Sequence, residues 1–337
     1  MTWFFASGFA IFAFVMSSFL TWVAIGALSR RAILDRPNER SSHTIPTPTG
    51  GGLAPVGVLI LIWCLVALAG KTPAAPFFII VGLAALLTCE GWIDDMHSIS
   101  PFKRLLWQGA SVLLAIIFAP LPGPVFGGWL PPIADGLIAG LAWVWFINLF
   151  NFMDGIDGLA GGETVSTGIG IAVVAGILNL DGDLHVLGLT MAATVAGFVI
   201  FNWHPARIFM GDTGSIPLGF LLGWLLLNLA AHGQWAAAAI LPLYFLFDAT
   251  WTLVRRAYRG EKVWHAHREH LYQKAVRHGA GHDQVVRSVL IANLVFIGLA
   301  AAAASGWVWP SLAGAAIVLG ILVHRLKSMG GGQDAAG

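Results

Sequence analysis

Long apolar runs separated by short polar segments divide this chain of 337 residues from one end to the other. About 20 consecutive apolar residues are enough to cross a bilayer as an α-helix. The pattern therefore predicts an all-α, polytopic membrane bundle that forms a single domain over residues 1–337, with residues 328–337 as a disordered, glycine-rich tail. The eleven predicted spans cover approximately residues 3–28, 52–70, 76–93, 105–120, 134–152, 164–180, 185–202, 215–231, 235–254, 287–305 and 308–324.

Composition and hydropathy agree with this pattern. The chain is 57% hydrophobic and only 10% charged, whereas a soluble domain carries about 25% charged residues. Its mean hydropathy is +0.79, and tryptophans mark many span ends as an aromatic belt would. Both cysteines, Cys64 and Cys89, lie in apolar runs, where we interpret them as packing thiols that indicate no redox compartment.

The basic residues are distributed unequally between the two sides of the predicted bundle. The odd-numbered loops and the C-terminal tail hold 17 of the 18 lysines and arginines, and Lys71 alone lies on the other side. The positive-inside rule makes the basic side cytoplasmic. We therefore expect the N-terminus outside and the C-terminus inside.

One polar stretch, from Asn148 to Gly162, follows directly on an apolar run. Asn148, Asn151, Asp154 and Asp157 recur at every third residue. On a straight helix such steps turn each residue by about 60°, which would put the first and last of the four on opposite faces. Two Asp-Gly pairs let the chain leave helical geometry, so we predict a helix ending near Met153 and a loop that folds both carboxylates back over its end.

Further polar clusters occur in other loops of the basic side. Arg40, His43 and Gly50–Gly52 precede the second span, where they form either an anion site at a helix start or an ordinary polar loop. Asp94 and Asp95 end the third span and point in different directions on a helix, so they can serve different partners. Paired carboxylates suit a divalent cation or a diphosphate–metal complex, although a helix cap by Asp95 or Ser100 is the alternative for one of them.

The remaining candidates lie after the seventh and ninth spans. Asp212 stands between glycines, where a ligand can approach the backbone closely. Asp248 lies seven residues before Arg255 on the same helix face, which favours a structural ion pair. In the ninth loop, His265, His267 and His270 accompany basic residues and no thiolate, which favours anion binding over zinc.

All these clusters share one side of the membrane. A transporter is expected to place polar groups near the bilayer midplane, with access from both sides. The pattern instead predicts an enzyme with one cytoplasmic site, and a transporter or flippase of lipid-linked sugars is the alternative.

Five motifs, in order along the chain, give the sequence a resemblance to the family of polyprenyl-phosphate N-acetylhexosamine-1-phosphate transferases. They extend from Asp35 to about Gln273. The motifs are Asp35-x-Pro…Arg40…His43…Pro46-x-Pro48…Gly51-Gly52, Asp94-Asp95, Asn148-x-x-Asn151-x-x-Asp154-Gly-x-Asp157-Gly158-Leu159, Phe209-Met-Gly-Asp212-Thr-Gly-Ser215 and the histidine loop.

The resemblance implies a reaction and its participants. Undecaprenyl phosphate attacks a UDP-N-acetylhexosamine, sugar-1-phosphate passes to the lipid, and UMP leaves. It further implies a bacterial inner membrane location, Mg²⁺ as cofactor (with Mn²⁺ as the alternative) and no nucleic-acid partner, and it leaves a homodimer open.

The resemblance also implies roles for individual residues. Asp212 is the expected metal ligand with Asp95 beside it, and Asp94 matches the proposed base, although a phosphate nucleophile already ionised at pH 7 needs little deprotonation. Asp94, Asp95, Asp154 and Asp157 form the expected catalytic group. The expected substrate-binding residues are Arg40, His43, Asn148, Asn151, Asn202, Phe209, His265, His267, Arg268 and His270.

Two departures from the peptidoglycan enzyme of this family bear on the sugar. That enzyme has a basic residue where this chain has Ser98, and three consecutive histidines where this chain has His267-Arg-Glu-His270. The pattern is closer to the subgroup that initiates O-antigen synthesis, often with 6-deoxyhexosamines. The roles within the histidine loop stay open, as does the identity of the sugar.

Overall fold

The computed structural model describes residues 1–337 except 36, 38–44, 70–73, 182, 264–266 and 330–337. The predictions for Arg40, His43, His265 and most of the C-terminal tail therefore lie outside the described residues. The elements are α1 Trp3–Arg30, β1 Leu34–Asp35, β2 Thr47–Pro48, α2 Leu53–Ala69, α3 Ala74–His97, α4 Pro101–Phe118, α5 Pro132–Phe152, α6 Leu159–Leu178, α7 Leu184–Asn202, α8 Asp212–Leu229, η1 Ala230–Gln234, α9 Trp235–Ile240, α10 Leu243–Tyr258, α11 Leu271–Arg277, α12 His282–Ala304 and α13 Val308–Ser328.

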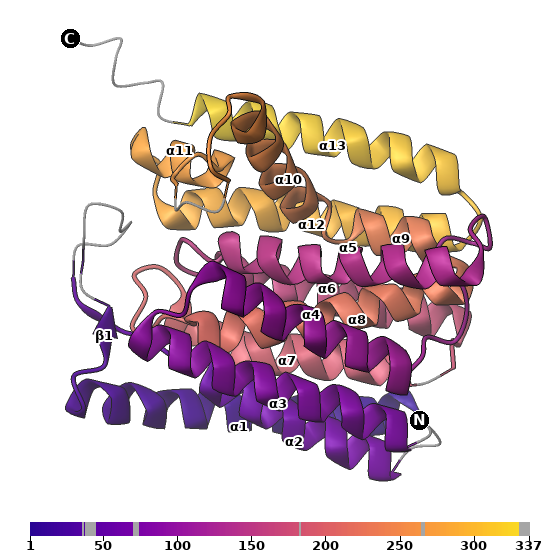
Figure 1. Cartoon of the computed structure of the whole chain (residues 1–337), viewed down its shortest axis with the longest axis horizontal. Coiled ribbons are helices and arrows are strands. Elements are labelled where there is room, and N and C mark those ends of the chain that lie inside the picture. Colours follow the sequence, from indigo (N-terminus) through magenta and orange to yellow (C-terminus); the bar gives the residue numbers. More distant parts are fainter. Residues whose placement is uncertain (36, 38–44, 70–73, 182, 264–266, 330–337) are drawn as a thin grey trace.

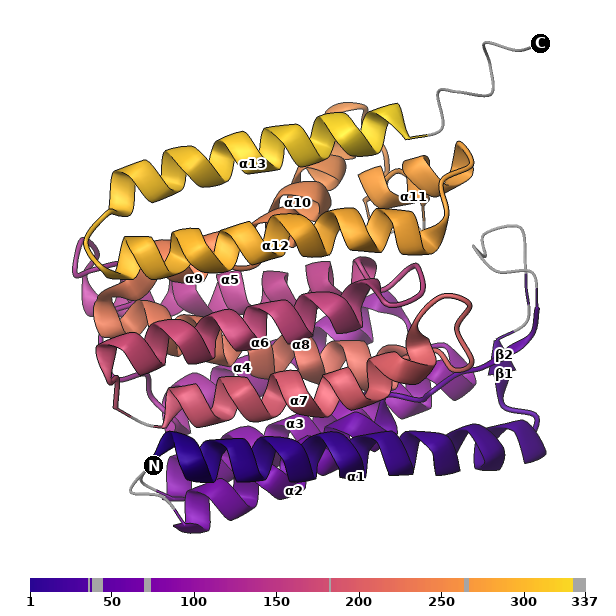
Figure 2. The same ribbon diagram turned by 180° about the vertical axis from the view of Figure 1, so that it is seen from behind.

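The predicted polytopic helical bundle is confirmed. Within the described residues, nine helices are long and apolar enough to cross a membrane, and α2 is a shorter apolar helix of 17 residues. The predicted count of eleven is thus approximate. The long helices lie side by side along one common direction, while α10 crosses it obliquely (Figures 1 and 2).

One predicted span, residues 235–254, differs from the structure. It is divided into α9 and α10, with Pro242 as the residue before α10. Proline has no backbone N–H and restricts the residue before it, so a helix tends to end there. α9 instead continues α8 through η1, and together they form a candidate span over Asp212–Ile240.

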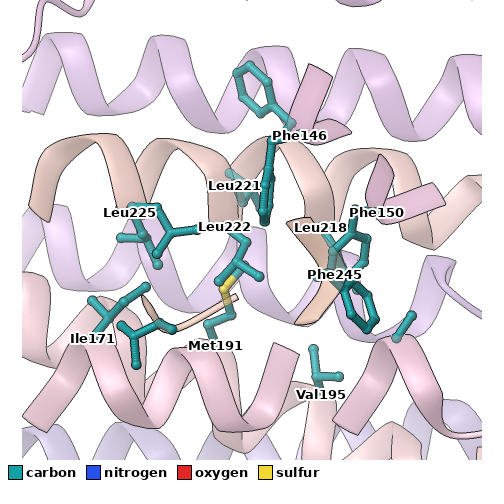
Figure 3. Packing of buried hydrophobic residues seen from close by; sticks show 14 of the residues in the cluster. Phe146, Phe150, Ile171, Met191, Val195, Leu218, Leu221, Leu222, Leu225 and Phe245 are labelled. Atoms are coloured by element: carbon teal, nitrogen blue, oxygen red, sulfur yellow. The ribbon is translucent and has the colours of Figure 1, made fainter. Parts of the chain in front are cut away.

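The centre of the bundle is α8 with its continuation. In the most apolar stretch of this span, 83% of the residues are buried. This share is larger than in the other candidate spans of the described chain. Leu218, Leu222 and Leu225 of α8 lie among Phe150 of α5 and Met191 of α7 (Figure 3). Close packing on all sides leaves a core helix little freedom to move. The first residue of α8, Asp212, therefore has a fixed position at the end of the bundle.

The loops that carry the predicted polar clusters gather at one end of the bundle, with β1, α11 and the last turn of α13, while the N-terminus lies at the other end (Figure 1). Here β1 and β2 pair antiparallel, with Leu34 opposite Pro48 and Asp35 opposite Thr47. These two-residue strands are the only departure from the all-α prediction in the described chain. We call this end of the molecule the loop end.

Candidate active site

A pocket of about 520 Å³ is lined by residues of the loops and helix ends at the loop end. Its wall combines carboxylates, amides and one aromatic ring from segments far apart in the sequence. The lining residues are Leu34, Asp35, Thr49, Asp95, Asn151, Asp154, Gly155, Ile156, Asp157, Asn202, Phe209, Met210, Gly211, Asp212, Gln273 and His282. Seven of the predicted site residues are among them.

The loop that follows α5 forms one wall of this pocket. α5 ends at Phe152 with Met153 as its C-cap, and Gly158, with φ of +77°, makes the turn into α6. Residues other than glycine adopt this left-handed conformation at a cost. Asp154 and Asp157 therefore lie in a loop above the end of α5, as the spacing of the polar residues predicts.

Asp212 is held in place by Asp95 on the neighbouring helix α3. The Oδ1 atom of Asp95 accepts the backbone N–H of Asp212 at 2.9 Å. Its Oδ2 atom accepts the N–H of Thr213 at 3.1 Å and the Thr213 hydroxyl at 2.5 Å. A carboxylate that accepts the free N–H groups at a helix start stabilises that start, so Asp95 fixes the first turn of α8.

Asp94 faces a different partner from Asp95, as expected for neighbours on a helix. Its Oδ1 atom accepts the backbone N–H of Ile99, and its Oδ2 atom accepts Arg104 Nη1 at 2.9 Å. The same nitrogen of Arg104 donates to Asp212 Oδ2 at 2.8 Å. Arg104 thus bridges two carboxylates, and Asp94 lies behind the pocket wall, buried to 9% exposure.

Asn151 completes the contacts of Asp212. Its Nδ2 atom donates to Asp212 Oδ1 at 2.7 Å and lies 2.8 Å from Ser215 Oγ. The last turn of α5 is thereby joined to the first turn of α8. Both carboxylate oxygens of Asp212 have donors, and its side chain is still 24% exposed toward the pocket.

Asp154 is the least neutralised carboxylate of the pocket. No hydrogen bond to its carboxylate occurs among the described residues. Burial, together with the nearby charges of Asp212, Asp95 and Asp157, raises the pKa of Asp154 well above its ordinary value. A half-buried carboxyl group in such surroundings favours either a proton or a bound cation. We call Asp95, Asp154 and Asp212, with Asp94 and Arg104 behind them, the acidic end of the pocket.

Asp157 lies at the other end of the pocket and has several donors. His204 Nδ1 lies 2.6 Å from its Oδ2 atom, the N–H of Ala206 3.1 Å and His282 Nδ1 3.4 Å. Burial alone would raise the pKa of Asp157, but the hydrogen bonds from His282, His204 and Ala206 outweigh burial and hold the pKa below its ordinary value. Asp157 is therefore ionised at pH 7, and these contacts stabilise its charged form.

Asn202 and Phe209 flank Asp157. Asn202 accepts the N–H of Gly158 at 3.0 Å through Oδ1 and donates to the carbonyl of Ile208 at 2.9 Å, so its amide fixes both loops. The backbone of Phe209 donates to Pro48 O and accepts from Gly51 N. The half-buried Phe209 is part of the pocket wall. We call Asp157, Asn202, Phe209, His204 and His282 the histidine end of the pocket.

The glycine run before α2 has a structural role in the described chain. Gly51 and Gly52 donate their N–H groups to Phe209 O and Met210 O, both at 2.9 Å, so these two groups are not free for an anion. A Cβ atom on Gly52 would lie 2.2 Å from the Cα atom of Gly214. Glycine here lets the start of α2 pack directly against the start of α8.

Several predicted site residues lie away from the pocket wall. Asn148 donates to Gln108 Oε1 at 2.7 Å and to Val144 O at 2.8 Å, so it joins α5 to α4. His267, Arg268 and His270 are outside the lining set. Burial, then the charges of His270 and Arg256, lowers the pKa of His267 to about 4, so this ring is neutral at pH 7 and lacks the charge that anion binding favours.

The predicted ion pair between Asp248 and Arg255 is wrong. Asp248 is fully buried and accepts hydrogen bonds from Tyr244 OH, Thr252 Oγ1 and the backbone N–H of Leu271. Arg255 is exposed at the end of α10. A buried carboxylate beside the start of α11 finds nearby N–H and O–H donors, so it needs no partner two helical turns away. Asp248 therefore anchors the segment that carries Gln273 to the pocket.

Three contributors to the site were not predicted from the sequence. Arg104 carried a signal, since it is a basic residue close after Asp94 and Asp95. His204 and His282 carried none, because each is a single histidine whose contact with Asp157 depends on folding of distant segments.

Comparison with known proteins agrees with this description. Residues 77–230 match the model of Glycosyl transferase family 4. The decaprenyl-phosphate N-acetylglucosaminephosphotransferase of Mycolicibacterium smegmatis is 30% identical, with 96% of this chain and 89% of that protein covered. The probable undecaprenyl-phosphate N-acetylglucosaminyl 1-phosphate transferase of Bacillus subtilis is 27% identical, with 90% and 87% covered. The phospho-N-acetylmuramoyl-pentapeptide-transferase of Thermosynechococcus vestitus is 33% identical, with 59% and 56% covered.

The membrane-type helices and the carboxylate-rich pocket, taken together with these relatives, place the chain in the class of integral membrane transferases. The chain belongs to the family of polyprenyl-phosphate N-acetylhexosamine-1-phosphate transferases. The family inferred from the sequence motifs is thereby confirmed.

Proposed function

We propose that this chain transfers an N-acetylhexosamine 1-phosphate from a UDP-sugar to undecaprenyl phosphate and releases UMP. The observation that carries the proposal is the division of one pocket into two ends. At the acidic end, the Asp154 carboxylate has no hydrogen-bond partner in the described chain, and the histidine end holds the ring of Phe209. The first suits a diphosphate with its cation, and the second suits a nucleoside.

In the proposed reaction, an oxygen of the lipid phosphate attacks the phosphorus atom that carries the sugar. A P–O bond forms between the lipid phosphate and the sugar phosphate. The P–O bond from this phosphorus to the bridging oxygen of UDP breaks, and the bridging oxygen leaves with UMP. A phosphate monoester has its second pKa near 6, so the nucleophile is already mostly ionised at pH 7. Asp94, whose carboxylate is occupied by Ile99 and Arg104, therefore orients Arg104 rather than removing a proton.

The acidic end fits a magnesium ion. This end contains four carboxylates, and Arg104 is the single cation paired with any of them among the described residues. Mg²⁺ prefers oxygen ligands, usually one or two carboxylates plus substrate phosphates. Asp212 and Asp154 would hold the ion, with Asp95 as a further candidate behind Asp212. When bound, the ion would neutralise phosphate charge that otherwise repels the incoming lipid phosphate; Mn²⁺ is the alternative.

An apolar groove between α4 and α5 suits the polyprenyl chain. Its volume is about 430 Å³, and Gly109, Val112, Gly136 and Gly140 contribute to its walls. Gly109 follows Arg104 by five residues, about 7.5 Å along the helix. A lipid lying in this groove would thus bring its phosphate toward the acidic end. Asn148, which joins the two helices next to the groove, is the residue we expect to influence lipid binding.

The sugar is expected to lack a lactyl-peptide arm, because the basic residue and histidine run of the peptidoglycan enzyme are absent at Ser98 and His267–His270. The relatives with the broadest coverage are described as acting with N-acetylglucosamine. We therefore propose an N-acetylhexosamine, including 6-deoxy forms, and a role in initiating O-antigen or a related envelope polysaccharide. Efficient transfer from UDP-N-acetylmuramoyl-pentapeptide would refute this choice.

The loop end is proposed to face the cytoplasm of a bacterial inner membrane, because it carries nearly all the basic loops. Ser98 and Ser305 are exposed serines. Ser98 follows α3 at the loop end, and Ser305 follows α12, which starts at the loop end with His282 and ends at the other end of the bundle. In a background without Cys64 and Cys89, Ser98→Cys should resist an impermeant thiol reagent in intact cells, and Ser305→Cys should react. The reverse labelling would overturn the orientation.

Purified protein tests the reaction directly. It is incubated with undecaprenyl phosphate and a panel of UDP-N-acetylhexosamines, and UMP and lipid-linked sugar are measured. The proposal predicts equal amounts of both products, dependent on Mg²⁺. A transporter or flippase would bind lipid-linked sugar without UMP release, and that result would replace the enzyme assignment.

A further inference from the structure

Three segments distant in sequence meet at the carboxylate of Asp157. Asp157 belongs to the loop between α5 and α6, His204 to the segment after α7, and His282 is the first residue of α12. The two histidine rings lie 4.8 Å apart, centroid to centroid. His282 is 7% exposed and lines the pocket, whereas His204 is 39% exposed and is not among the lining residues.

In the described chain, all three contacts of the Asp157 carboxylate are made by one of its oxygens. Oδ2 has His204 Nδ1 at 2.6 Å, the N–H of Ala206 at 3.1 Å and His282 Nδ1 at 3.4 Å. Oδ1 has no such partner among the described residues. The carboxylate is thus held by one oxygen, and the other is left as an acceptor in the pocket wall.

His282 also contacts the backbone of Asp157. Its Nδ1 atom lies 3.4 Å from the backbone nitrogen as well as from Oδ2. With a proton on Nδ1 the ring donates to the carboxylate, and without it the ring accepts the backbone N–H. Both tautomers hold Asp157 against the start of α12.

The three side chains also have the composition of a His₂-carboxylate metal site, and their candidate ligand atoms all lie within 4.8 Å of one another. The distances favour hydrogen bonds instead. Ligand atoms about 2.0–2.1 Å from a tetrahedral zinc ion lie about 3.3 Å apart. The 2.6 Å between His204 and Asp157 is a charge-assisted hydrogen-bond length, and Ala206 already donates to the same oxygen.

We infer that His204 and His282 are positioning residues, which clamp Oδ2 of Asp157 so that Oδ1 accepts a hydrogen bond from the nucleotide of the donor substrate. This inference rests on the proposed function. It gives two histidines that the sequence analysis did not single out the role of orienting a carboxylate in the pocket wall. Since the contacts of the Asp157 carboxylate with His204, Ala206 and His282 involve no residue of the acidic end, we expect the clamp to act on substrate binding and to leave the chemical step unchanged.

The test compares His282→Ala, His282→Asn and His204→Ala. Asparagine places an amide N–H near the position of His Nδ1, so His282→Asn should retain most of the function. His282→Ala should raise the KM for the UDP-sugar and the Kd for UDP about tenfold, the loss typical of one charge-assisted hydrogen bond, while kcat changes less than twofold. His204 is exposed, so His204→Ala preserves folding and should raise both constants in the same direction.

Controls separate positioning from general damage to the fold. His278 is an exposed histidine at the end of α11, and His278→Ala should change neither constant. In an Asp157→Ala background, adding His282→Ala should cause no further change, because the histidine acts through the carboxylate. A further loss in that background, or an unchanged UDP affinity in both single alanine variants, would overturn the clamp.

The same purified proteins also distinguish a metal site, a wrong proposed function and a wrong clamp. Stoichiometric zinc in the purified protein that disappears in His282→Ala would replace the clamp by a metal site. Wild-type protein that neither binds UDP nor releases UMP would overturn the proposed function, together with the nucleotide role assigned here. Active wild-type protein with unaffected histidine variants would overturn the clamp alone.

Discussion

The two ends of the pocket surround an aspartate carboxylate with opposite kinds of neighbours. Asp154 and Asp157 lie three residues apart in one loop, each followed closely by a glycine. The Asp154 carboxylate has no hydrogen-bond partner in the described chain, and its pKa is raised well above the ordinary value. The Asp157 carboxylate has three contacts at one oxygen, and its pKa is lowered. The difference arises from the neighbouring segments, because carboxylates surround the first and histidines the second.

This contrast indicates what each end can bind. A cluster of incompletely neutralised carboxylates gains most from a cation, and a cation with phosphate then completes the charge balance. A carboxylate whose charge is already stabilised by hydrogen bonds gains less from a cation, but its second oxygen can still accept a hydrogen bond. The acidic end thus suits phosphate transfer, and the histidine end suits recognition of the nucleotide.

The largest expected effect is on Asp212. Asp212→Asn keeps the shape of the side chain but removes the charge, so kcat should fall on the order of 10²–10³-fold, with an altered magnesium requirement. UMP release across a magnesium titration measures this. The matched control is Asp181→Asn, an exposed aspartate at the other end of the bundle. Near-wild-type turnover of Asp212→Asn with an unchanged magnesium requirement would reduce Asp212 to a turn-forming residue.

A smaller effect is expected at Phe209 in the histidine end. Stacking of a base on an aromatic ring is worth about 1–3 kcal/mol in other systems, so Phe209→Ala should raise the KM for the UDP-sugar by about 5- to 150-fold. Phe209→Tyr keeps the ring and should stay close to wild type. Steady-state kinetics at saturating lipid phosphate decide the matter, and an unchanged KM in Phe209→Ala would mean that the ring does not stack on uracil.

The smallest effect concerns the stability that Asp157 contributes. Its folded-state pKa is lowered, so this stability is fully present above the unfolded-state pKa near 3.9 and is lost as the pH falls through the lower folded-state value. At pH 7, Asp157→Asn should reduce the free energy of unfolding by about 1–2 kcal/mol. Thermal unfolding should show the same gap between wild type and variant at pH 7 and pH 5, and a gap that begins to narrow at pH 3.5. A gap that widens toward acid would contradict a lowered pKa.

The sequence alone predicted the helical membrane class, the loop after Met153 and the side on which the polar clusters meet, because these depend on local hydropathy and glycine positions. It could not predict that residues 235–254 divide at Pro242, since the whole run is apolar enough to span. Asp248 shows the same limit. Helical spacing suggested Arg255 as its partner. One of its actual donors, the N–H of Leu271, belongs to α11 and reaches Asp248 only through the tertiary fold.

The sequence predicted which carboxylates form the candidate site, but it did not predict most of the side chains that contact them. Asp94, Asp95, Asp154, Asp157 and Asp212 occur in motifs, so their meeting at one end followed from the order of the spans. Which oxygen each one offers depends on side chains brought in from other segments. Neither hydropathy nor spacing encodes the contact between His282 and Asp157, which are 125 residues apart.

One measurement tests the division of the pocket most directly. Asp154→Asn and Asp157→Asn are the same substitution in one loop, and UMP release by the two purified variants is followed against UDP-sugar and magnesium. Asp154→Asn should lower kcat and alter the magnesium requirement with little change in UDP affinity, whereas Asp157→Asn should raise the KM for the UDP-sugar with kcat nearly unchanged. If both variants show the same profile, or if the two profiles are exchanged, the pocket does not have the two ends described.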